Sequence, residues 1–113
     1  MKQLSGAEVC AQLQARFAHA PALVLLDVRE DWEVAVAAIA PHGATALHIP
    51  MGELVQRLHE LDPAQPVVCL CHHGMRSAQV VAFLERAGFA EVYNLTGGID
   101  AWSRDVDPRI PRY

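Results

Sequence analysis

Apolar and polar residues follow a pattern along the chain that predicts its secondary structure. A capping-box pattern at residues 5–8 precedes apolar positions four residues apart, which favours an amphipathic helix over residues 5–18. Continuous apolar runs at residues 22–28 and 66–70 are typical of strands buried on both faces. The remaining pattern predicts extended segments at 46–49 and 92–95, helices over 31–38, 52–60 and 99–103, and a helix from Ser77 to just before Gly88.

The alternation of strands and helices predicts an α/β fold. Strands that alternate with helices form βαβ units, so we expect a parallel sheet with helices on both faces. The 113 residues fit a single domain over residues 1–113, without an internal repeat. Ligands of such folds bind beyond the carboxyl ends of the strands, and two predicted strands end there in polar residues, at Asp27–Glu30 and at Cys71.

Composition limits the kinds of partner that this chain can bind. Hydrophobic residues make up 52% and charged residues 19%, a balance typical of a soluble globular domain. The net charge of −4 predicts no general attraction to nucleic acid or to an anionic membrane. The sequence shows no secretory signal and no apolar run long enough for a membrane helix, and three cysteines do not suggest a disulfide framework. We therefore expect a cytoplasmic protein that binds any anion through a local arrangement.

The segment from Cys71 to Ser77 offers that local arrangement. Cys71 leaves a buried strand and enters a short loop before the helix expected from Ser77, whose first turn presents unpaired N–H groups. A tight loop that contains Gly74 can direct successive N–H groups at one centre, and Arg76, with His72 and His73, adds positive potential. The pKa of Cys71 should therefore lie below the usual value of about 8.5. The same loop would hold a small oxyanion or a persulfide anion.

The cysteines also allow two other interpretations. Cys10 and Cys69 fit ordinary buried cysteines, because free cysteine is often buried. Cys69, Cys71, His72 and His73 are all residue types that bind zinc, but their spacing does not match the usual zinc motifs. We therefore predict no metal site and no cofactor.

Four segments of the chain, in the same order, resemble the single-domain bacterial members of the rhodanese family. These are residues 26–30 with Glu33, 48–50, 67–77 and 95–102. The resemblance implies a rhodanese-like, five-stranded parallel sheet flanked by helices on both faces, with Cys71 as the sulfur-accepting nucleophile. The loop from Cys71 through Arg76 would have six residues. The fold-related dual-specificity phosphatases of the cell cycle have one more residue between cysteine and arginine, so the length favours sulfur over phosphate.

This sequence departs from the family pattern in two places. Many relatives have arginine after the cysteine, whereas this loop has His72, His73 and, further on, Met75. Residues 37–43 replace a Gly-His-Ile segment that many members carry. The substrate preference within the family therefore stays open.

The resemblance implies a thiosulfate sulfurtransferase that works through a cysteine persulfide. Cys71 would take sulfane sulfur from a small anionic donor such as thiosulfate and pass it to cyanide or a thiol. Arg76 would close the loop and Ser77 would cap the next helix. Two alternatives are a persulfide carrier or regulatory module that serves a partner protein, and a phosphatase or arsenate reductase, which the loop length disfavours. The residues expected to bind substrate are His72, His73, Gly74, Met75, Arg76 and Ser77.

Several other residues have predicted supporting roles. Asp27 and Arg29 are expected to form an ion pair that fixes the strand–helix junction, with Glu33 as a further partner, in preference to a direct catalytic role. His48, Trp32 and Trp102 are expected to pack or to form hydrogen bonds, although Trp32 is also placed to line the mouth of a pocket. No spare apolar face is evident, which favours a monomer.

Overall fold

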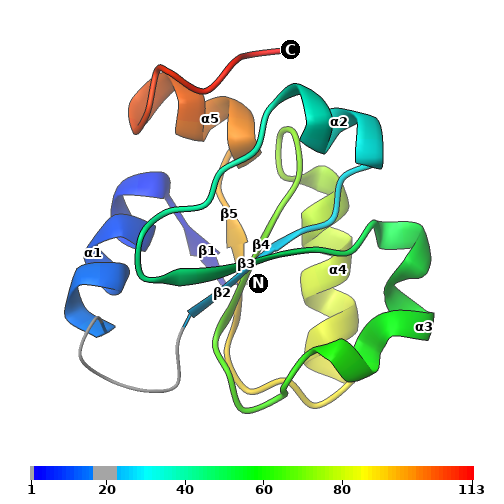
Figure 1. Ribbon diagram of the computed structural model, residues 1–113. Coiled ribbons are helices and arrows are strands. Elements are labelled where there is room, and N and C mark those ends of the chain that lie inside the picture. The colour runs from blue at the N-terminus through cyan, green and yellow to red at the C-terminus, as the bar shows by residue number, and fades with distance from the viewer. Residues whose placement is uncertain (1, 17–22) are drawn as a thin grey trace.

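The computed structural model, which describes residues 2–16 and 23–113, contains a five-stranded sheet (Figure 1). The strand order is β1-β5-β4-β2-β3, and every neighbouring pair is parallel. The predicted parallel sheet is therefore confirmed. Residues 17, 18 and 22, predicted as helix and strand ends, lie outside the described residues. The strands are β1 Gln3–Leu4, β2 Leu23–Asp27, β3 Ala44–His48, β4 Val67–Leu70 and β5 Val92–Leu95.

Helices cover both faces of the sheet, as predicted (Figure 1). On one face lie α1 (Gly6–Arg16) and α5 (Gly98–Asp105). On the other lie α4 (Met75–Arg86) and α3 (Leu54–Arg57), and α3 is flanked by the 3-10 turns η1 (Met51–Glu53) and η2 (Leu58–Glu60). The short helix α2 (Asp31–Val36) follows the carboxyl end of β2. None of the helices among the described residues is long and apolar enough to cross a membrane.

The central strands are buried on both sides, which explains their continuous apolar sequences. In β2, Leu23 and Leu25 pack toward α1 and α5, whereas Val24 and Leu26 pack toward α3 and α4. Side chains of a strand alternate between its two faces, so a strand covered by helices on both faces needs apolar residues at every position. This packing fixes the carboxyl ends of β2 and β4 side by side, since Asp27 pairs in register with Leu70.

The structure differs from the predicted pattern at a few boundaries. The sequence pattern did not predict the edge strand β1, because its two residues are too few to show the alternation of a strand. Among the described strands it pairs with β5. The helix α4 begins at Met75 and not at Ser77, because Gly74 takes a left-handed conformation (φ 107°) that ends the loop earlier. The first turn of α4 therefore contains Arg76 and Ser77. The predicted helix over 31–38 ends at Val36, and the predicted helix over 52–60 is divided into η1, α3 and η2.

Candidate functional site

The loop between β4 and α4 surrounds the sulfur of Cys71 with donors. The backbone N–H of Gly74 donates to the sulfur at 3.1 Å, and the N–H of Ser77 does so at 3.4 Å. The Ser77 hydroxyl also lies 3.4 Å from the sulfur, and Cys71 is only 1% exposed. Burial by itself would raise the pKa of Cys71, but the donors from Ser77, Gly74 and Arg76 outweigh it and hold the pKa below the ordinary value. The predicted ring of N–H donors is confirmed, and it favours a thiolate.

The helix α5 holds the loop from outside by binding its carbonyl groups. The N–H of Ile99 donates to the carbonyl of Cys71 at 2.9 Å, and the N–H of Asp100 donates to that of His72 at 3.1 Å. Gly98 (φ 62°) makes this close approach possible, because a Cβ there would collide with both loop carbonyls. These two hydrogen bonds fix the backbone at the start of the loop, next to Cys71.

Asn94 joins the last residue of the loop, Gly74, to Ser77 in the first turn of α4, and the sequence pattern did not predict this role. Its side chain, 3% exposed, donates from Nδ2 to the Gly74 carbonyl at 3.0 Å, while Oδ1 accepts from the Ser77 hydroxyl at 2.6 Å. The predicted capping role of Ser77 is wrong, since Gly74 occupies the N-cap and the hydroxyl of Ser77 faces Asn94 and the sulfur. A lone amide in the apolar strand β5 was the signal that could have identified it.

Arg76 is paired with a carboxylate on α2. Its guanidinium contacts both oxygens of Glu33, at 2.6 and 2.8 Å, and Glu33 is only 3% exposed. The guanidinium lowers the pKa of Glu33 to about 2, so this carboxylate is ionised at neutral pH. The predicted positive potential of Arg76 is therefore largely balanced by Glu33. Arg76 links the end of the loop to α2.

The predicted ion pair between Asp27 and Arg29 is confirmed at the end of β2. Arg29 is fully buried, and its Nη2 and Nε lie 2.6 and 2.9 Å from the two carboxylate oxygens of Asp27. The same guanidinium donates to the carbonyls of Ala37 and Glu33 at 2.7 and 3.3 Å, while His48 donates to the carbonyl of Arg29 at 2.7 Å. These contacts fix the junction between β2 and α2, and they confirm His48 as a hydrogen-bonded residue.

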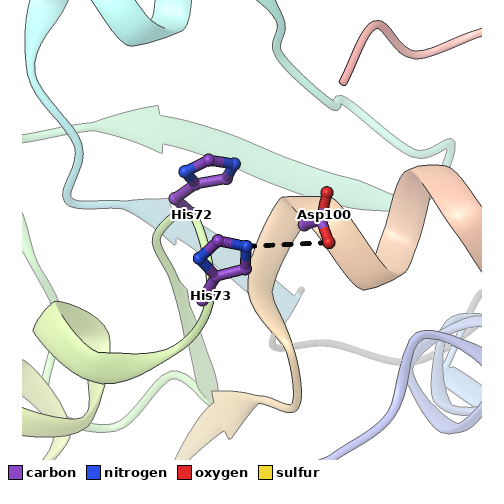
Figure 2. A group of neighbouring side chains, drawn as sticks. All are labelled: His72, His73 and Asp100. Atoms are coloured by element: carbon purple, nitrogen blue, oxygen red, sulfur yellow. Dashed lines mark ion pairs between the residues drawn. The ribbon is translucent and has the colours of Figure 1, made fainter. Parts of the chain in front are cut away.

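The two loop histidines differ in environment. His72 is stacked between His73, at 4.1 Å between ring centroids, and Tyr113, at 4.0 Å. Burial and the neighbouring His73 lower the pKa of His72, which disfavours the positive charge that the sequence suggested for it. The side chain of His73 is 64% exposed and lies 3.7 Å from Asp100 (Figure 2). Met75 points into solvent, with 77% of its surface exposed.

His72, His73 and Asp100 lie close enough together to be considered as ligands of one metal ion (Figure 2). One potential ligand atom from each lies within 4.8 Å of the others, and this is the one such group in the described part of the chain. The two rings are stacked at 19°, so their nitrogen lone pairs lie in nearly parallel planes and do not converge on a tetrahedral centre. Arg112 also occupies both oxygens of Asp100, at 2.9 and 3.1 Å. As arranged, these residues do not fit zinc.

The remaining predicted positions fall into two groups. Cys69 and Trp102 are buried as predicted, at 0% and 4% exposure, and burial strongly raises the pKa of Cys69. Cys10 is half-buried. Trp32, in contrast, is 62% exposed, and its ring meets the edge of Tyr113 at 5.9 Å between centroids. Trp32 therefore packs against Tyr113 on one side and is otherwise largely exposed, and its place at the mouth of a pocket stays a prediction.

A parallel α/β sheet with a loop at its carboxyl edge whose N–H groups surround a cysteine sulfur is an arrangement that favours a thiolate. Comparison with known proteins identifies the family. The chain belongs to the family described as the rhodanese-like domain, whose model matches residues 9–105. The rhodanese-like fold implied by the sequence is thereby confirmed.

Individual relatives agree with this family assignment. YtwF of Bacillus subtilis (strain 168) is 36% identical over 109 residues, which cover 96% of this chain and 97% of YtwF. GlpE of Vibrio cholerae, named thiosulfate sulfurtransferase, is 32% identical over 94 residues, which cover 83% of this chain and 80% of GlpE. A rhodanese-related protein of Thermoplasma volcanium has a similar structure, with a TM-score of 0.80, 26% identity and complete coverage of both chains. YtwF and GlpE are both named as sulfurtransferases, which supports a general sulfurtransferase activity.

Proposed function

We propose that this protein is a thiosulfate sulfurtransferase in which Cys71 carries sulfur as a persulfide. The observation that supports this most strongly is the ring of donors around a buried cysteine sulfur, with N–H groups of Gly74 and Ser77 at 3.1 and 3.4 Å. These donors are preorganised, so they stabilise negative charge on the sulfur without rearrangement during the reaction. The relative GlpE is named a thiosulfate sulfurtransferase, which agrees with this choice of donor.

The reaction takes two nucleophilic steps at the same sulfur atom. The Cys71 thiolate attacks the outer sulfur of thiosulfate, a new S–S bond forms, and the electron pair of the broken bond leaves with sulfite. Cyanide or a thiolate then attacks the terminal sulfur of the persulfide, and the electron pair of that second S–S bond returns to Cys71. Cyanide yields thiocyanate, whereas a thiolate yields a new persulfide, and no external oxidant or reductant is needed.

The loop residues have separate roles in this proposal. The backbone N–H groups of Gly74, Arg76 and Ser77 hold the persulfide anion. Met75, between Gly74 and Arg76, is 77% exposed and is available for contact with an acceptor. Asp27 and Arg29 act through the scaffold at the end of β2 and do not touch the sulfur donor.

A persulfide carrier that serves a partner protein is the second candidate. Two large apolar side chains, Trp32 and Met75, are 62% and 77% exposed, and both belong to elements that border the loop. Exposed apolar side chains beside a reactive group favour a macromolecular acceptor over a small one. In that role the protein would form the persulfide but would turn over slowly with cyanide.

Steady-state turnover with thiosulfate and cyanide tests the proposal. We expect thiocyanate formation that is abolished in Cys71→Ser and retained in Cys69→Ser, because Cys69 is buried in the sheet with a raised pKa. Thiocyanate formation that survives in Cys71→Ser would overturn the assignment of Cys71. A persulfide that forms in a single turnover without sustained thiocyanate production would instead favour the carrier.

A further inference from the structure

The segment after α5, residues 106–113, returns across the carboxyl edge of the sheet toward α2, and we call it the strap (Figure 1). The hydroxyl of Ser103 in α5 donates to the carbonyl of Ile110 at 2.6 Å. Arg112 pairs with both oxygens of Asp100, which also lies in α5. These contacts anchor the strap to α5 and deliver Tyr113 to the loop that follows β4.

The side chain of Tyr113 contacts residues outside α5, in addition to the contacts that anchor the strap to α5. Its ring stacks on His72, with 4.0 Å between centroids and 7° between planes. Its hydroxyl accepts a hydrogen bond from Arg29 Nη1 at 2.8 Å and donates one to Glu33 Oε1 at 2.9 Å. The ring also meets Trp32 edge-on. Tyr113 is therefore fixed by a stack on one side and by two buried charged groups at its hydroxyl.

These contacts place Tyr113 against one end of the cysteine loop and against the residue that holds its other end. His72 is the residue directly after Cys71, while Glu33 holds the guanidinium of Arg76 at the other end of the loop. A side chain that contacts His72 and Glu33 together must span the rim of the loop whose N–H groups surround the sulfur. Because Cys71 is 1% exposed, the side chains on this rim decide what can reach the sulfur.

We propose that Tyr113 is a specificity-determining residue that limits the size of the acceptor admitted to Cys71. The ring supplies the wall, and the hydroxyl holds the ring in place through Arg29 and Glu33. The proposal rests on the proposed sulfur transfer, because the molecule whose size Tyr113 limits is the sulfur acceptor. A small acceptor passes Tyr113, whereas one with a bulky group next to its reactive atom does not.

Alkylation of Cys71 by two reagents that share one reactive group tests the proposal. Iodoacetamide is the small reagent and N-phenyl iodoacetamide is the bulky one, and peptide mapping follows the modification of Cys71. The ratio of the two rates cancels any change in the thiolate fraction, so a merely structural effect on the pKa does not move it. The control is Arg109→Ala, because Arg109 lies in the strap, is 89% exposed and forms its ion pair with Asp107, which also lies in the strap.

We expect Tyr113→Leu to raise the ratio of bulky to small reagent about tenfold, the change that corresponds to about 1.4 kcal/mol of barrier. Tyr113→Phe keeps the wall and should change the ratio less than Tyr113→Leu, whereas Tyr113→Trp enlarges it and should lower the ratio. A ratio for Tyr113→Leu equal to that of Arg109→Ala would overturn the proposal. If Tyr113→Leu does not fold, an unchanged or higher ratio in Tyr113→Trp would overturn it instead.

This experiment separates the wall from the proposed function. Alkylation needs only the thiolate of Cys71 and no sulfur donor. The alkylation ratios can follow the prediction in a protein that takes no sulfur from thiosulfate. That result would support the role of Tyr113 and reject the proposed sulfur transfer. Sulfur transfer through Cys71 with ratios that do not depend on residue 113 would reject the wall alone.

Discussion

Glu33 and Arg76 form a two-point ion pair that joins α2 to the first turn of α4. The two guanidinium nitrogens lie 2.6 and 2.8 Å from the two carboxylate oxygens, and Glu33 also accepts a hydrogen bond from Tyr113. The pair connects the cysteine loop to the end of β2, because Arg29 binds the backbone of the same helix. The ion pair with Glu33 thus holds the loop on the side of α2, and hydrogen bonds from the N–H groups of Ile99 and Asp100 hold it on the side of α5.

The Glu33–Arg76 pair predicts a dependence of stability on pH. The pKa of Glu33 is lowered from 4.5 to about 2, so its ionised form stabilises the folded state above pH 4.5, and that contribution is lost as the pH falls toward 2. Glu33→Gln should therefore lower the free energy of unfolding at pH 7 by about 1–3 kcal/mol. Urea denaturation at pH 7, 4.5 and 2.5 measures the difference in free energy of unfolding between the wild type and Glu33→Gln. This difference should become smaller as the pH falls from 4.5 to 2.5.

A control for this measurement is Glu53→Gln, which removes an exposed partner of Arg57 on the surface. Its effect at pH 7 should stay below about 1 kcal/mol. A difference between the wild type and Glu33→Gln that stays constant from pH 7 to 2.5 would show that the carboxylate charge is not the source of the stability.

The hydroxyl of Ser77 predicts a change in thiol reactivity. Ser77→Ala removes a hydroxyl that lies 3.4 Å from the sulfur and whose one proton is shared between Asn94 and Cys71, so the pKa of Cys71 should rise. For a contact worth at most about 1 kcal/mol, alkylation of Cys71 by iodoacetamide at pH 7 should slow by up to about fivefold. The rate measured against pH gives the direction of the shift directly. Ser5→Ala, which removes the capping hydroxyl of α1, should leave the pH profile unchanged; an unaltered profile in Ser77→Ala would contradict this role.

Gly98 predicts a strong effect on the loop from a single methyl group. Gly98→Ala would bring a Cβ against the carbonyls of Cys71 and His72 and would place alanine at φ 62°. We expect a loss of about 2–4 kcal/mol in the free energy of unfolding. The pKa of Cys71 should also rise, because displacement of the loop moves its N–H donors away from the sulfur. Thermal unfolding and the pH profile of alkylation measure the two effects.

The matched control for Gly98 is Gly52→Ala. A Cβ added at Gly52 would meet no other described residue within 4 Å, and Gly52 does not adopt a left-handed conformation. The substitution should therefore leave the reactivity of Cys71 unaltered. Equal behaviour of the two variants would mean that α5 does not hold the loop through its close approach at Gly98.

The features that were predictable from sequence are those set by local pattern. Buried apolar runs identified β2 and β4, since strands covered on both faces need apolar residues at each position. The donor ring around Cys71 followed from the order of strand, glycine-containing loop and helix. The two-residue strand β1 was missed because pairing with β5, and not a local pattern, creates it.

The features that were missed depend on contacts between distant parts of the chain. Tyr113 reaches Glu33 across 80 positions, and Asn94 reaches Gly74 across 20, so neither contact leaves a local pattern. The lowered pKa of His72 comes largely from its burial, and its ring is stacked between those of His73 and Tyr113. Ser77 was predicted to cap a helix because the start of α4 was placed two residues too late.

The most direct test of the central claim follows one sulfur atom from the donor to the protein. The protein is incubated with thiosulfate that carries a heavy isotope only in its outer sulfur, and the intact mass and the peptide masses are then measured. We predict that one heavy sulfur is found on Cys71, that Cys69→Ser gains the same sulfur, and that Cys71→Ser gains none. Heavy sulfur on Cys71→Ser in the same amount as on the wild type would contradict the account.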